Sequence, residues 1–186
     1  MLFAHNLCIM WQEVEDSGST PGEPGVRHIN RVVAQMFIGQ FQHAIDEKGR
    51  LMIPARFREL LEGGGAYITQ GFDRCLMVMT EAYFNQVYER INSMNLANPD
   101  ARLLRRQMLS NAYPVDLDKI GRMLVPQNLR TFIGLDSEAI VAGQGGYFEI
   151  WTPATWNEQM TQMQNTAAAN QRFATLDLSK PITPQA

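Results

Sequence analysis

Residues 46–54 read DEKGRLMIP, and residues 118–126 read DKIGRMLVP, 72 residues further along the chain. The same offset continues without a gap into the flanking sequence. The identical pairs that it aligns include Asp46 and Asp118, Gly49 and Gly121, Arg50 and Arg122, Pro54 and Pro126, Arg58 and Arg130, Gly71 and Gly143, Thr80 and Thr152, and Ala82 and Ala154. Chance rarely keeps such a register, so the chain contains two copies of one small unit. Each unit is too small to bury a core alone, which predicts that the copies pack on each other or on other chains.

The composition suits one moderate domain or two small ones, since 45% of the 186 residues are hydrophobic. A net charge of −3 gives no general attraction for nucleic acid or membranes, so a polyanion would have to meet a local basic cluster. Cys8 and Cys75 show neither disulfide nor metal-site spacing, and no apolar run approaches the roughly 20 residues of a membrane span. We therefore expect a soluble, cytoplasmic protein with no membrane partner.

The first repeat predicts short strands around one short helix. A strand within residues 36–45 leads into a turn at Gly49, and residues 51–53 form the expected return strand. Pro54 suits the first turn of an amphipathic helix, which the glycine run at 63–65 ends.

Helices are expected between the repeats. After strands at 66–69 and 75–79, Thr80 is the predicted N-cap of one helix, and Asn98 followed by Pro99 opens a second. These two helices should form a hairpin that links the repeats.

The second repeat begins near Tyr113 and replays the same pattern. Gly134 is the expected stop of its short helix, and Thr152 with Pro153 begins a final helix that should continue to about Asn170. The predicted organisation has five segments: a disordered extension at 1–35, a first repeat domain at 40–83, a helical linker at 84–111, a second repeat domain at 112–155, and a C-terminal helix and tail at 156–186.

The D-x-x-x-R element admits two interpretations. In the first, Asp46 pairs only with Arg50, and Asp118 only with Arg122, as structural ion pairs. In the second, each aspartate orients its arginine so that the guanidinium faces outward, where it suits a phosphate or a guanine edge. The repetition of the same acidic and basic positions favours the second interpretation.

Further basic residues surround this element but form only a modest patch. The additional positive charges are Lys48, Arg56 and Arg58 in the first copy, and Lys119 and Arg130 in the second. A separate cluster on the second linker helix is more typical of a solvated helix face than of a nucleic-acid site; its members are Arg102, Arg105 and Arg106. The aromatic residues at 84, 88, 147, 148, 151 and 156 are predicted to be core, with Trp156 placed at a subunit contact.

The sequence offers little for catalysis. His5 and His28 fall in the extension, which leaves His43 without a metal partner at helical or hairpin spacing. Neither repeat aspartate precedes the small Thr/Ser-Gly turn of an aspartic-protease dyad, and the glycine run at 63–65 ends a helix instead of opening one around a phosphate. We expect no enzyme, no metal, no cofactor and no small-molecule substrate.

Three stretches carry a resemblance to a known family: MFIGQFQHAIDEKGRLMIPARFREL from Met36, RRQMLSNAYPVDLDKIGRMLVPQNLR from Arg105, and VAGQGGYFEIWTPATW from Val141. They closely resemble MraZ, a family of bacterial regulators made of two SpoVT/AbrB-like halves. The match extends from Met36 to about Trp156, and weakly to FATLDLS at 173–179. Family members start at the methionine that matches Met36, so residues 1–35 are either a lineage-specific tail or the product of an upstream start.

The resemblance implies an α+β fold in which two tandem AbrB-like swapped-hairpin units, related by a pseudo-two-fold, form a β-barrel-like core with connecting and C-terminal helices. It implies a homo-oligomeric ring that binds double-stranded DNA at repeated promoter boxes of the division and cell-wall gene cluster, its own promoter included, and hence a nucleoid-associated transcription regulator. The family's motif arginines map onto Arg50 and Arg122 and its motif lysine onto Lys48, whereas the second copy departs with Ile120. The expected DNA-binding residues are Arg50, Arg122, Lys48, Arg56 and Lys119, with Asp46 and Asp118 as orienting carboxylates. The alternative is an oligomeric structural scaffold that binds no DNA.

Overall fold

The computed structural model describes residues 36–61 and 64–164; the predicted extension at 1–35 and the end of the chain after 164 lie outside the described residues. The described part is an α+β fold with five helices. Its elements are β1 (Gln40–Ala44), β2 (Arg50–Met52), α2 (Ala55–Leu61), β3 (Ala66–Gln70), β4 (Leu76–Thr80), α3 (Glu81–Asn92), α4 (Pro99–Leu109), β5 (Tyr113–Val115), β6 (Arg122–Leu124), α5 (Gln127–Ile133), β7 (Glu138–Gly143), β8 (Tyr147–Trp151) and α6 (Pro153–Gln164).

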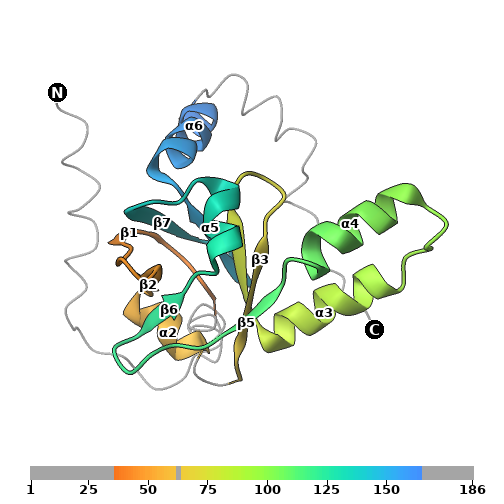
Figure 1. The fold of residues 1–186 in the computed structure, drawn as a ribbon, viewed down its shortest axis with the longest axis horizontal. Helices are drawn as coiled ribbons and strands as arrows, with labels where there is room; N and C mark the ends of the chain where they lie inside the picture. The colour runs from red at the N-terminus through yellow and green to blue at the C-terminus, as the bar shows by residue number, and fades with distance from the viewer. Residues whose placement is uncertain (1–35, 62–63, 165–186) are drawn as a thin grey trace, which may run out of the picture. The chain divides into compact units, whose positions relative to one another are not determined.

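Six strands form one antiparallel sheet in the order β1-β7-β8-β4-β3-β5 (Figure 1). The order mixes the two sequence repeats, because β1 of the first repeat pairs with β7 of the second, and β4 pairs with β8. Strands of both repeats therefore pair with each other within one sheet. The shared sheet is how two units, each too small for a core, obtain a common one.

The remaining strands, β2 and β6, form a separate two-stranded antiparallel ribbon. The expectation that β2 returns against β1 is wrong for most of its length, since the two strands meet at a single bridge between Ile45 and Leu51. Leu51 and Met123 lie opposite each other in the ribbon, and both side chains are completely buried. Pairing β2 with β6 buries both side chains against one core, and this apolar burial favours the exchange between repeats.

The expected β-barrel-like core is not a closed barrel. Strands β1 and β5 are the two edges of the described sheet, and the ribbon reaches them only through isolated bridges, Ile45 to Leu51 and Leu117 to Met123. The tight turns before β2 and β6 redirect the chain after one bridge, so continuous ladders cannot form there. Strand β5 is also three residues long and contains Pro114, which has no backbone N–H to donate.

The two faces of the sheet are covered by different elements. One face packs on the inner side of the ribbon and on α2 and α5, with Phe57, Leu129 and Phe148 in the central cluster. The other face packs on α3 and α4 through Met79, and on α6 through Trp156. Because both faces are covered, β4 is buried along four consecutive residues.

Three helix ends lie where the sequence predicts them, whereas the predicted continuation of the last helix to about Asn170 lies outside the described residues. Thr80 Oγ1 accepts a hydrogen bond from the Tyr83 N–H, Asn98 caps α4, and Gly134 ends α5 with a φ of 72°. Helices α3 and α4 form the predicted hairpin, an arm that extends beside the sheet (Figure 1). The prediction that the six aromatic residues are core is wrong for Tyr88, which lies on the exposed side of α3 and keeps 39% of its surface exposed. Trp156 is buried within the chain by Trp151.

Candidate nucleic-acid interface

The turn of the first repeat is built on the two carboxylate oxygens of Asp46. Oδ1 accepts the backbone N–H groups of Lys48 and Arg50, at 3.0 and 2.9 Å. Oδ2 accepts the side chain of Arg50, with Nε and Nη2 both at 2.8 Å. The backbone groups that Asp46 binds are therefore two and four residues on. The D-x-x-x-R spacing follows from these two sets of contacts, because one oxygen of the aspartate closes the turn and the other binds the arginine that begins β2.

The second repeat reproduces this geometry. Asp118 Oδ1 accepts the N–H groups of Ile120 and Arg122, at 3.1 and 3.0 Å. Asp118 Oδ2 accepts Nε and Nη2 of Arg122, at 2.8 and 2.7 Å. The two turns are thus copies in structure as well as in sequence.

The copies also meet each other. Arg122 Nη1 donates to Asp46 Oδ2 at 3.1 Å, and Arg50 Nη1 lies 3.8 Å from Asp118 Oδ2, beyond hydrogen-bond distance. The result is a four-residue charge cluster with no net charge, at the outer surface of the ribbon. The arginine side chains keep 30% and 24% of their surface exposed.

The pKa values of both carboxylates are lowered in this cluster. The backbone N–H of Arg122 contributes most to the shift at Asp118, followed by its guanidinium, and the pKa falls to about 2. The pKa of Asp46 is lowered for the same reason, chiefly by the backbone N–H of Arg50. Both aspartates are therefore ionised at neutral pH and keep the arginines paired.

Two further arginines lock each turn to the opposite repeat. Arg58 of α2 packs on Gly121 and donates through Nη1 to the Ile120 carbonyl at 3.3 Å. Arg130 of α5 packs on Gly49, and its Nε donates to the Val125 carbonyl of its own repeat at 3.1 Å. A Cβ on either glycine would overlap the arginine that packs on it. Both glycines also have a positive φ, 78° at Gly49 and 83° at Gly121. These positions thus require glycine for two independent reasons.

Backbone hydrogen bonds complete the exchange. The N–H of Ile53 donates to the Gly121 carbonyl, and the N–H of Val125 donates to the Gly49 carbonyl, both at 3.0 Å. Each turn is consequently held by the repeat it does not belong to.

The outer face of the ribbon follows from strand alternation. Leu51 and Met123 point into the core, so their neighbours Arg50, Met52, Arg122 and Leu124 point outward. Across the ribbon, Arg50 is opposite Leu124 and Met52 is opposite Arg122. Two positive and two apolar side chains therefore occupy diagonal corners of one small surface.

A sequence profile described as "MraZ protein, putative antitoxin-like" matches residues 36–107 and, a second time, residues 108–177. The chain belongs to the MraZ family. A protein named transcriptional regulator MraZ from Thermomicrobium roseum is 44% identical over 142 residues, which cover 76% of this chain and 99% of that protein. Regulators of the same name from Roseiflexus castenholzii and from Clavibacter michiganensis are each 42% identical over 133 residues, with 72% of this chain and 92% of theirs covered.

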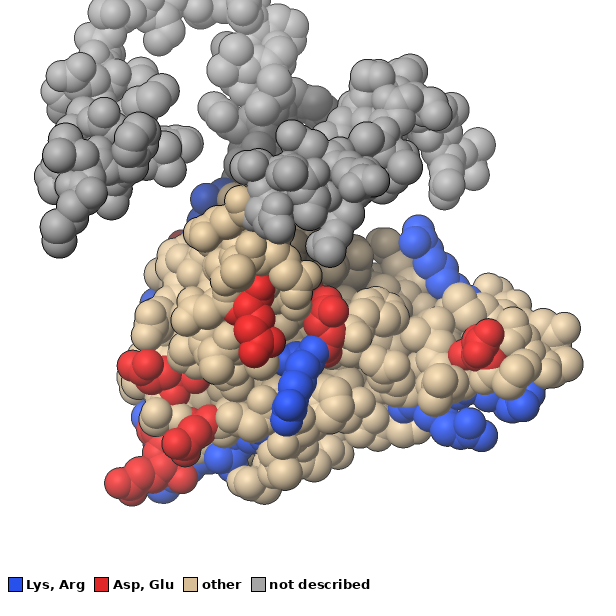
Figure 2. All heavy atoms as spheres, turned by 90° about the horizontal axis from the view of Figure 1, so that it is seen from above, with Lys and Arg blue, Asp and Glu red and all other residues tan. Residues whose placement is uncertain are grey.

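The other predicted site residues of this MraZ chain are distributed around the ribbon. Lys48 and Lys119 are exposed in the two turns, and Arg56 is exposed on α2. On the face seen in Figure 2, basic and acidic side chains are interspersed and leave no continuous basic surface. From the sequence, Arg58 and Arg130 are predicted only to add local positive charge, and their packing on the turn glycines is not predicted. Their identical alignment at the 72-residue offset was the signal that both serve the turns.

The prediction that the three arm arginines form one solvated helix face is confirmed only for Arg106, because the other two are partly buried. Arg105 is half-buried and donates to the carbonyls of Ile91 and Asn92 at the end of α3, at 3.0 and 3.2 Å. Arg102 donates to the carbonyls of Leu96 and Ala97 in the connecting loop. Arg105 satisfies carbonyls at the C-terminus of α3, and Arg102 satisfies carbonyls of the loop, so both stabilise the hairpin. Only Arg106 of the three is exposed.

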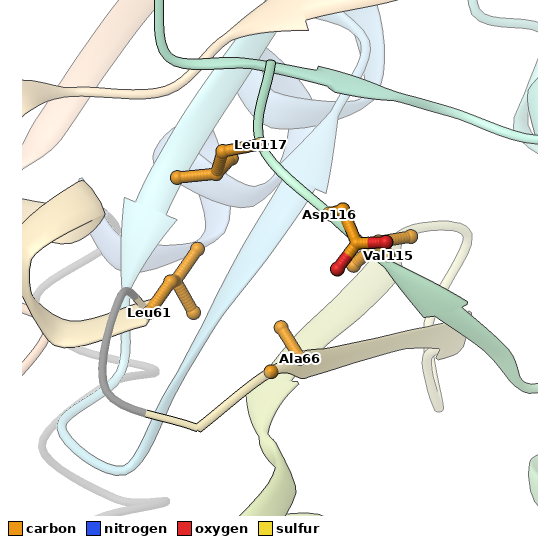
Figure 3. A pocket seen from close by; sticks show the side chains of 6 residues that line it. Leu61, Ala66, Val115, Asp116 and Leu117 are labelled. Carbon is orange, nitrogen blue, oxygen red and sulfur yellow. The ribbon is translucent and has the colours of Figure 1, made fainter. Parts of the chain in front are cut away.

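The described residues include an open hollow of about 440 Å³ at the loop between α3 and α4, lined by Met94, Asn98 and Leu104 among others. A second hollow of about 210 Å³ between α2, β3 and the segment after β5 is lined by Leu61, Ala66, Val115 and Leu117, with Asp116 as its single acid (Figure 3). This is smaller than a typical ligand pocket. Within 36–61 and 64–164, no three His, Cys, Asp or Glu side chains are grouped to hold a metal ion. Helices in the same ranges are all too short or too polar to cross a membrane.

Proposed function

We propose that this protein is a sequence-specific DNA-binding transcriptional regulator and that the outer face of the ribbon reads DNA. The observation that carries the proposal is the duplicated carboxylate clamp, in which Asp46 holds Arg50 and Asp118 holds Arg122 at a partly exposed surface. A clamped guanidinium loses less freedom on binding than a solvated one, so it can recognise an acceptor pair at lower entropic cost. The relatives' name, transcriptional regulator, supports the same conclusion.

The ribbon is a type of element that can enter a DNA groove. A two-stranded antiparallel ribbon fits the major groove of B-form DNA, where arginine pairs with guanine O6 and N7. Arg50 and Arg122 lie on the same outer face of β2 and β6. Arg50 binds Asp46 through Nε and Nη2, whereas its Nη1 lies 3.8 Å from Asp118 Oδ2, beyond hydrogen-bond distance. Lys48, Lys119 and Arg56 would then contact phosphates, which position the ribbon without reading sequence.

One subunit should bind DNA weakly. The four-charge cluster is neutral, and the whole chain carries −3, so counterion release from a single contact is small. We propose a homo-oligomeric ring in which several ribbons meet repeated boxes on one duplex, because linked weak contacts multiply through effective concentration. The boxes would lie upstream of the division and cell-wall gene cluster, including the protein's own promoter. Such a regulator would be cytoplasmic, nucleoid-associated and non-catalytic.

We further propose that the two halves, 40–83 and 112–155, are SpoVT/AbrB-like swapped-hairpin domains, with 84–111 as their helical linker and 156–186 as a C-terminal helix and tail. The pairing of β2 with β6 and the reciprocal bonds from Ile53 and Val125 to the opposite turns support this description.

A second function keeps one observation in its favour. Every charge of the cluster finds an opposite charge inside the chain, as a purely structural lock would require. On that reading the protein is an oligomeric scaffold without DNA affinity. The two functions share the fold and differ only in what the outer face contacts.

The deciding experiment is a gel shift with the DNA upstream of the protein's own coding region, at fixed salt. Arg50→Ala should weaken binding by about 1 to 3 kcal/mol per engaged subunit if the guanidinium reads a base. Arg106→Ala, an exposed arginine on the arm, is the matched charge control and should bind as the unaltered protein does. Undiminished binding by an Arg50→Ala, Arg122→Ala double variant that still melts cooperatively would refute the proposed site. If the unaltered protein does not bind the duplex, the scaffold function is supported instead.

A further inference from the structure

An exposed leucine stands beside the first clamped arginine. Leu124 is directly opposite Arg50 in the ribbon register, and it keeps 54% of its surface exposed. Its strand neighbour Met123, which points the other way, is completely buried. Opposite residues on one face of an antiparallel pair have Cβ atoms about 4.5 to 5.5 Å apart. Leu124 is therefore an apolar contact available within one side-chain length of the proposed reading group.

The two ends of the ribbon carry different side chains, with Leu124 beside the first turn and Met52 beside the second. Where the first repeat has Lys48 in its turn, the second has Ile120, which is 56% exposed. Leu124 aligns with Met52 at the same offset, and Met52 is only half-exposed. A scattered exposed leucine needs no explanation on its own. Here, however, the strand register places Leu124 on the same surface as Arg50.

We infer that Leu124 contacts the C5-methyl group of a thymine adjacent to the base read by Arg50. This inference rests on the proposed function, since it assigns specificity within the same DNA-reading face. Thymine alone among the four natural bases presents a methyl group in the major groove, and apolar side chains are its usual partners. Successive bases are about 3.4 Å apart along a strand, so a side chain about 5 Å from a base-reading residue falls over a neighbouring base step.

With this contact, the two ends of the ribbon recognise different groups of the DNA. The end of the ribbon beside the first turn carries Leu124, which favours a thymine methyl, and Lys48, which favours a phosphate. The end beside the second turn carries Met52, with Ile120 in place of Lys48. A duplex box is then bound in one orientation, even though the clamps themselves are repeated.

Single thymine-to-uracil replacements test the contact, because uracil differs from thymine only by the missing methyl. The probes are duplexes from upstream of the protein's own coding region, each with one thymine replaced, and affinities are measured for the full chain. Losing one buried methyl should weaken binding about fourfold, which is roughly 0.8 kcal/mol, at one position of the box. Leu124→Ala should bind the thymine duplex about fourfold more weakly and should not distinguish it from the uracil duplex at that position.

Leu103→Ala is the matched control, since it removes the same side chain from α4 at 62% exposure; it should retain the full sensitivity to uracil. Thermal melting and light scattering of both variants report folding and assembly. Sensitivity to uracil that survives in folded Leu124→Ala overturns the inference, as does a full set of uracil duplexes that bind like thymine. In those cases the arginine variants still report on the proposed function. If Leu124→Ala loses its affinity only because the oligomer dissociates, the residue lies between copies and the thymine contact is also refuted.

Discussion

Arg122 Nη1 lies 3.1 Å from Asp46 Oδ2, so the arginine of the second repeat shares the turn carboxylate of the first. Arg50 approaches Asp118 in the opposite direction, at 3.8 Å. The repeats are joined at their charged surface as well as in their sheet. A change to either turn should consequently be felt in both, which lets stability and DNA affinity be measured as separate consequences of one substitution.

Removing the carboxylate of Asp46 should separate the two interpretations of the clamp. Asp46→Ala loses the acceptor of the Lys48 and Arg50 N–H groups as well as the partner of two guanidinium groups, so its melting temperature should fall. Asp46→Asn keeps one neutral oxygen for the turn and should recover part of that loss. If Asp46 orients Arg50 for DNA, both variants should also bind the upstream duplex more weakly. Affinity that stays unchanged in the folded fraction of each sample would leave the aspartate a structural role alone.

Gly121→Ala should destabilise the fold by about 2 to 4 kcal/mol, through both a positive φ and an overlap with the middle of the Arg58 side chain. Gly134→Ala is the matched control, because its φ of 72° is similar but no atom lies within 4 Å of the new methyl; it should cost about 1 kcal/mol. Chemical denaturation measures both. Adding Arg58→Ala to Gly121→Ala should recover part of the difference between them. Equal losses for the two glycines would show that the arginine does not constrain the turn.

Acid should weaken the clamp of the second repeat between about pH 4 and pH 2. The pKa of Asp118 is about 2 in the fold, against 3.8 for an ordinary aspartate. A carboxyl group with a lowered folded pKa contributes stability above its unfolded pKa, and that contribution disappears as pH falls through the folded value. Thermal melts across this range should therefore decline more steeply for the unaltered protein than for Asp118→Asn. Parallel curves would mean that Asp118 titrates normally.

The arm arginines should differ in stability despite their adjacency. Arg105→Ala removes two hydrogen bonds to carbonyls at the end of α3 and should cost about 1 kcal/mol, whereas Arg106→Ala should cost close to nothing. Neither should change the affinity for the upstream duplex, since the arm carries no part of the proposed reading face. A selective loss of DNA affinity in Arg105→Ala, with an unchanged melting temperature, would instead place the arm on the DNA.

The local structure could be read directly from the sequence. Thr80, Asn98 and Gly134 mark helix ends because a short polar side chain or a positive φ acts within a few residues. The D-x-x-x-R spacing likewise determines each turn, because Asp46 satisfies backbone and side-chain donors no more than four residues away. The identical register of the two repeats was enough to pair Asp46 with Asp118 and to indicate a duplicated site.

Which strand lies beside which was decided only by the tertiary structure. Three-residue strands such as β2 and β6 have no register preference strong enough to choose a partner, so burial of Leu51 and Met123 against one shared core selects the ribbon over two local hairpins. The same packing brings Arg122 to Asp46 and Arg58 to Gly121, contacts between residues more than sixty positions apart. It also turns Leu124 outward beside Arg50. Long-range neighbours depend on the total apolar surface that the fold buries, and no local pattern of residues encodes that quantity.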